Sequence, residues 1–151
     1  MKNLPLVLIL ILAILLRFAW LSSYPPALFV DEAAIGYNAW SLSMDLRDEF
    51  DNFLPIAFRS WGTYTAPLQF YLAIPGLLIF GLNEFGTRFH AAFLGSLTVL
   101  ITYFLTYAWF KNRRLSLIAS IFLALSPWHI NQSRMAVEPI ISVFFLSLAM
   151  Y

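Results

Sequence analysis

The chain has 151 residues, of which 61% are hydrophobic and 11% are charged, with a formal net charge of +1. Soluble domains carry about a quarter charged residues, so this composition excludes an ordinary soluble domain and predicts an integral membrane protein. The absence of cysteine excludes disulfides and thiolate metal sites, and no basic tract or glycine-rich phosphate loop points to a nucleic acid or nucleotide.

The first apolar segment, residues 4–21, is long enough to predict a membrane crossing. It exceeds the usual apolar region of a signal peptide and ends near Trp20 and Tyr24, aromatic residues that favour the membrane interface. Lys2 favours a cytoplasmic N-terminus. Arg17 lies near the outer end, where we expect its guanidinium to reach the lipid headgroups.

The acidic pair Asp31 and Glu32 follows this segment and its Pro25-Pro26 stop. Carboxylates at the edge of a bilayer are costly unless they are solvated or paired, which makes both residues candidates for a catalytic role. The alternative is local, because acidic residues also favour the first turn of any helix. Helical spacing of apolar residues predicts such a helix over residues 31–45, lying along the membrane surface.

The next stretch, residues 45–64, predicts an irregular loop whose aromatic side chains either anchor in the headgroups or face a sugar. Residues 67–82 are apolar, but the stretch is short and is interrupted by Pro67, Pro75, Gly76 and Gly81. We therefore expect a re-entrant or surface-lying helix there and not a crossing.

The remaining crossings are predicted over residues 89–110, 115–130 and 140–151, the last of them incomplete at Tyr151. The basic cluster around Lys111 favours the cytoplasm, so the loop 22–88 and every acidic side chain would lie outside. The predicted fold class is an all-α integral membrane protein, a polytopic helical bundle with a long first external loop containing surface-lying helices. We expect the chain to be the N-terminal part of a longer protein or a truncated product.

A reaction on a lipid phosphate needs a carboxylate to accept a proton and cations to hold the phosphate. Asp31 or Glu32 meets the first need, and Arg88 and Arg134 meet the second. The alternative for each arginine is contact with lipid headgroups. His90 and His129 share no motif, so we predict no metal site from them.

Four motifs follow one another in a familiar order. They are Asp31-Glu32, Tyr64-Thr65-Ala66-Pro67-Leu68, the stretch from Phe80 to Arg88, and the loop from Ser133-Arg134 to Glu138. Together they resemble the N-terminal part of the GT-C glycosyltransferases of the protein O-mannosyltransferase and lipid A aminoarabinose transferase type. Thr65 and Ala66 depart from the lysine and proline of the aminoarabinose subfamily, which weakens assignment to that subfamily alone.

The resemblance implies a membrane glycosyltransferase that moves a sugar from a polyprenyl-phosphate donor to a protein, lipid or glycan acceptor on the outer face of the cytoplasmic membrane. It implies an inverting mechanism with Asp31 as base and Glu32 as its partner. Arg88, Arg134, Glu138 and Tyr64 would contact the substrate or its phosphate. It implies no certain cofactor, and a divalent metal stays open. Because the family's remaining helices normally complete the donor site, we expect this chain alone to be inactive.

Two other readings stay open at this point. In a transporter or flippase of a lipid-linked substrate, the same charges would line a pathway and no bond would be made. In an inactive membrane fragment or assembly partner, they would serve the structure alone.

Overall fold

The computed structural model describes residues 3–60 and 62–151, so Lys2 and Trp61 lie outside the described residues. The chain divides into two compact units: a helical unit, Met1–Trp20 and Ala91–Tyr151, and a loop unit, Leu21–His90. Within the described residues there are seven helices and one two-stranded hairpin. The prediction of a mostly helical chain is confirmed, and the hairpin is an addition to the predicted all-α class.

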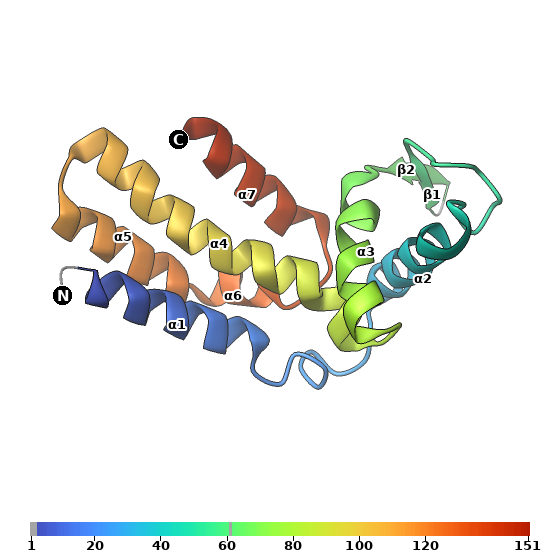
Figure 1. Ribbon diagram of the computed structural model, residues 1–151, viewed down its shortest axis with the longest axis horizontal. Helices are drawn as coiled ribbons and strands as arrows, with labels where there is room; N and C mark the ends of the chain where they lie inside the picture. The colour runs from blue at the N-terminus through green and yellow to red at the C-terminus, as the bar shows by residue number, and fades with distance from the viewer. Residues whose placement is uncertain (1–2, 61) are drawn as a thin grey trace. The chain divides into compact units, whose positions relative to one another are not determined.

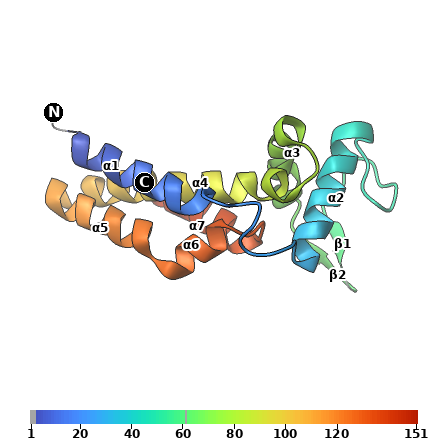
Figure 2. The same cartoon turned by 90° about the horizontal axis from the view of Figure 1, so that it is seen from below.

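The helical unit contains α1 (Leu4–Phe18), most of α4 (Glu84–Phe110), α5 (Arg113–Leu125), α6 (Pro127–Ser133) and α7 (Glu138–Met150). Helix α1 lies along α5, as Figures 1 and 2 show. Small and branched side chains from α1, α4 and α5 form a buried core in this unit: Ile9, Ala13, Val99 and Ala124.

The predicted crossing over residues 115–130 is divided into two helices in the structure. Helix α5 ends at Leu125, and Ser126 caps α6, its Oγ accepting a hydrogen bond of 3.5 Å from the His129 N–H. Pro127 follows at the first position of α6, where its missing N–H has no helical partner to lose. The Ser-Pro step therefore ends one helix and begins the next.

Helix length limits which segments can cross a bilayer. Among the described residues, α4 has 27 residues and is long and apolar enough to cross. Helices α6 and α7 would make a second span only if the pair, bent by 111°, is one broken span. Helices α1 and α3 (Leu68–Phe80) are apolar but shorter. The four predicted crossings thus remain a prediction.

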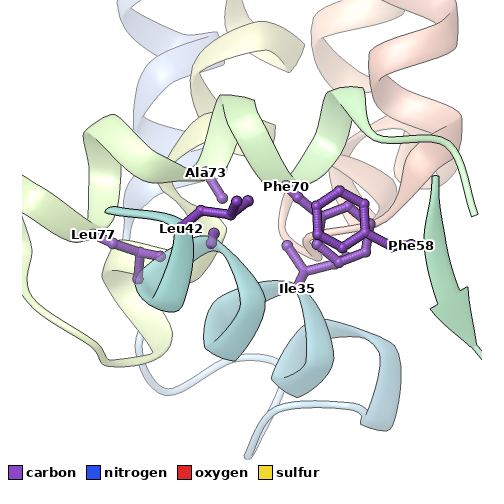
Figure 3. Packing of buried hydrophobic residues seen from close by; sticks show 7 residues of the cluster. Ile35, Leu42, Phe58, Phe70, Ala73 and Leu77 are labelled. Carbon is purple, nitrogen blue, oxygen red and sulfur yellow. The ribbon is translucent and has the colours of Figure 1, made fainter. Parts of the chain in front are cut away.

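The loop unit packs α2 (Val30–Asp45) against α3. Figure 3 shows the apolar side chains between them, with Phe58 and Phe70 stacked at a centroid distance of 3.8 Å. Residues of both helices and of β1 form this core: Ile35, Ala39, Leu42, Phe58, Phe70, Ala73 and Leu77. Fully burying a leucine, isoleucine or phenylalanine side chain of this core contributes about 1.5 to 3 kcal/mol.

The stretch that the sequence predicts to be irregular includes the antiparallel hairpin of β1 (Phe58–Ser60) and β2 (Thr63–Thr65). Phe58 is buried while Arg59 is exposed, which is the alternation of a strand with one covered face. Gly62 has φ +83°, a conformation that short hairpin turns require and glycine adopts at little cost. The buried Phe58 therefore ties the hairpin to the α2–α3 core.

Candidate functional site

Asp31 and Glu32 occupy the first turn of α2, which begins with Val30 after the N-cap Phe29. Successive helical residues point about 100° apart, so one carboxylate faces outward while its neighbour faces the protein. The Asp31 side chain is exposed and forms no hydrogen bond or ion pair with the described residues, whereas Glu32 is 0% exposed. Of the two predicted catalytic carboxylates, only Asp31 is exposed.

The buried Glu32 forms a two-point ion pair with Arg88 near the start of α4. Arg88 Nε donates to Glu32 Oε1 at 2.9 Å, and Arg88 Nη2 donates to Glu32 Oε2 at 3.0 Å. Oε2 also accepts the Phe29 N–H at 3.0 Å, which supplies a partner for one of the free N–H groups at the helix N-terminus. Glu32 thus joins α2 to α4 and closes the first turn of its own helix.

Three backbone carbonyls take up the other donors of Arg88. Nη1 donates to Leu21 O at 3.1 Å and to Pro25 O at 2.8 Å, and Nη2 donates to Ala27 O at 2.6 Å. A guanidinium has five N–H groups, so these bonds and the two to Glu32 engage every one. The cluster of Glu32, Arg88 and these three carbonyls is called the Arg88 clamp below.

A glycine lets α2 and α4 approach beside the Arg88 clamp. A Cβ atom on Gly36 would lie 2.8 Å from Thr87 Oγ1 and 3.3 Å from Thr87 Cγ2. Gly36 is one helical turn after Glu32, and Thr87 precedes Arg88. The absence of a side chain at Gly36 therefore helps bring the two charged residues within hydrogen-bonding distance.

The other predicted substrate contacts lie on separate elements. Tyr64, on β2, is 71% exposed, and its side chain forms no hydrogen bond with the described residues. Glu138 is exposed and begins α7 in the helical unit. Arg134, also in the helical unit, donates to Leu16 O at 2.9 Å, to Arg17 O at 3.4 Å and to Trp20 O at 3.3 Å. The structure therefore brings together Glu32 and Arg88, with Asp31 next to Glu32 in sequence, and Arg134 bonds the end of α1.

The expectation that Arg17 reaches the headgroups is wrong, because its side chain is 0% exposed. Arg17 donates to Ala13 O at 3.0 Å and to His129 Nδ1 at 2.8 Å. It also bonds Leu123 O and Ala124 O, both at 3.4 Å, in the last turn of α5. The final carbonyls of a helix lack helical partners and carry partial negative charge, so they attract a buried cation.

In the ranges 3–60 and 62–151, no three His, Asp or Glu side chains are grouped to hold a metal ion. His129 lies beside Arg17, and Ser133 Oγ is 3.3 Å from the same ring nitrogen. A Cβ atom on Gly95 would lie 2.6 Å from Ser133 Cβ and 3.4 Å from Arg17 Nε, so α4 and α6 are close at this point. His129 thus contacts both Arg17 and Ser133 beside Gly95.

Comparison with known proteins gives one family and one relative. The family model described as dolichyl-phosphate-mannose-protein mannosyltransferase matches residues 7–151. An uncharacterized protein of Aquifex aeolicus (strain VF5) is 33% identical over 85 residues, which are 56% of this chain and 17% of that protein. The chain thus covers less than a fifth of the length of this relative. No solved structure matches.

Proposed function

The chain belongs to the dolichyl-phosphate-mannose-protein mannosyltransferase family, and we propose on that premise that it serves in a membrane glycosyltransferase. The donor is a sugar carried on a polyprenyl phosphate, and the acceptor is a hydroxyl group presented outside the membrane. The observation that carries the proposal is the accessible Asp31 carboxylate, next in sequence to the buried Glu32–Arg88 pair.

Asp31 acts as the general base in this proposal. Its carboxylate accepts the proton of the acceptor hydroxyl as the oxygen attacks the anomeric carbon of the sugar. The bond between that carbon and the phosphate oxygen breaks, and the polyprenyl phosphate leaves with the bonding electrons. Attack opposite the leaving group inverts the anomeric configuration. Tyr64 and Glu138, both exposed, remain candidates for contact with the sugar or the acceptor.

The direct test is Asp31→Asn in the protein as its gene encodes it, assayed for sugar transfer from polyprenyl-phosphate mannose. Loss of a general base lowers the rate about 100- to 10,000-fold, and we expect a fall in this range with membrane insertion unchanged. Asp45→Asn is the matched control, because Asp45 is an exposed carboxylate at the other end of α2. Full turnover of Asp31→Asn would exclude Asp31 as the base. Movement of the donor across vesicles without product would indicate a flippase.

The proposed topology places Asp31 and Glu138 outside the membrane and Lys111 in the cytoplasm. The chain has no cysteine, so single cysteines can be introduced beside these three residues and labelled from outside. We expect labelling beside Asp31 and Glu138 but not beside Lys111. Labelling beside Lys111 together with Asp31 would mean that α3 crosses the membrane, and Glu138 would then lie on the opposite face from Asp31.

A further inference from the structure

We propose that Arg88 is a positioning residue, which holds the segment carrying Asp31 in place, and that it is not a ligand of the donor phosphate. This inference rests on the proposed function and changes the role that the sequence predicts for Arg88. The observation behind it is that the Arg88 clamp engages all five N–H groups of a fully buried guanidinium.

A phosphate could bind Arg88 only by displacing a partner that is already bonded. Displacing Glu32 would leave a buried carboxylate without its counter-charge, which is strongly unfavourable. Displacing the carbonyl of Leu21 would leave a buried acceptor unpaired, and displacing those of Pro25 or Ala27 would break part-buried hydrogen bonds that hold the loop 21–27. The guanidinium has no donor left that could bind a phosphate without one of these losses.

The bonds of the Arg88 clamp instead determine where Asp31 lies. They join the start of α4 to two other segments, the first turn of α2 through Glu32 and the loop 21–27 through its carbonyls. Because Glu32 is held inward, helical geometry turns the neighbouring Asp31 away from the Arg88 clamp. Arg88 therefore acts on the reaction through the position of the base and not through contact with the substrate.

The test compares Arg88→Gln, Glu32→Gln and the double variant in the full protein, with three readouts. These are kcat, the KM for the polyprenyl-phosphate sugar, and the binding of polyprenyl phosphate alone. For a positioning pair, we expect each single variant to lower kcat about 10-fold or more while KM and polyprenyl-phosphate binding change less than about 3-fold. The kcat of the double variant should be no lower than the kcat of the less active single variant, because the two residues act as a unit.

A phosphate ligand predicts a different pattern. Arg88→Gln would then weaken polyprenyl-phosphate binding by about 10-fold or more, while Glu32→Gln would leave it unchanged, and this outcome would overturn the inference. Failure of the proposed function looks different again: the unaltered protein would neither transfer sugar nor bind polyprenyl phosphate.

The single variants carry an unpaired buried charge and can fail to fold, so two further variants keep the inference falsifiable. The double variant removes both charges, and its binding of polyprenyl phosphate decides the matter: retention supports the inference and loss overturns it. Arg88→Lys keeps the charge, and lysine binds phosphate well as a point charge but cannot reproduce five fixed bonds. We expect this variant to lose kcat and to expose residues 21–27 to proteolysis, whereas near-normal kcat would contradict the inference.

Discussion

The two units each bury one arginine completely, and they neutralise it in different ways. In the loop unit, Arg88 pairs with the carboxylate of Glu32. In the helical unit, Arg17 has no carboxylate partner among the described residues and bonds only helix carbonyls and His129 Nδ1. A buried arginine therefore holds an acidic side chain in the loop unit and bonds the carbonyls at the end of a helix in the helical unit.

In the helical unit, two arginines bond the carbonyls at the end of another helix, and they do so in opposite directions. Arg17, on α1, bonds the last turn of α5, and Arg134, after α6, bonds the carbonyls at the end of α1. Each arginine supplies donors to carbonyls at the end of a helix, where the regular N–H partners four residues further on are missing. Arg17 thus bonds the end of α5, and Arg134 bonds the end of α1. The predicted contact of Arg134 with the substrate or its phosphate stays a prediction.

Replacing each arginine in turn tests this difference between Arg88 and Arg17 most strongly. Arg88→Met leaves the buried Glu32 carboxylate unpaired, and we expect the free energy of unfolding to fall by about 3 to 5 kcal/mol. Arg17→Met leaves only neutral acceptors unpaired, so we expect a loss of about 1 to 2 kcal/mol. Equilibrium unfolding in mixed detergent measures both. Equal losses in the free energy of unfolding would mean that the charge of Glu32 makes no difference to the cost of removing the arginine.

A smaller effect is expected from the glycines beside the two arginines. Gly95→Ala would place a Cβ 2.6 Å from Ser133 Cβ, an atom fixed by the backbone of α6, and we expect a loss of about 1 to 3 kcal/mol. Gly36→Ala would place its Cβ 2.8 Å from Thr87 Oγ1, a smaller overlap than at Gly95, and we expect a loss of about 1 kcal/mol or less.

The same unfolding measurement applies to both glycine variants. Ser133→Gly, combined with Gly95→Ala, is the control, since it removes the side chain that the new methyl group meets. Recovery of part of the loss in the double variant would locate the strain between α4 and α6. A larger loss for Gly36→Ala than for Gly95→Ala would mean that the helices beside the Arg88 clamp yield less than those beside Arg17, contrary to this prediction.

Several local features could be predicted from the sequence because neighbouring residues determine them. The helix containing Asp31 and Glu32 follows from apolar spacing and acidic residues at its start. The break between α5 and α6 also has a local signal, because Ser126 is a favourable N-cap and Pro127 a favourable first helical residue.

The surroundings of the arginines could not be predicted, because their partners are mostly backbone carbonyls. Any residue provides a carbonyl, so no side-chain pattern marks Leu21 or Ala27 as a partner of Arg88. Arg17 resembles an interfacial arginine in sequence, and its burial depends on the end of α5, more than a hundred residues further along the chain. These contacts come from tertiary packing.

The carbonyl partners of Arg88 also determine which positions around it tolerate substitution. A carbonyl survives substitution of its own side chain, so Pro25 and Ala27 can change identity without deleting a hydrogen-bond acceptor from the Arg88 clamp. Glu32 and Arg88 have no such tolerance, because each supplies its charge through the side chain. In homologous chains we therefore expect the two charged positions to be retained or lost together, while the residues between the first segment and α2 vary around them.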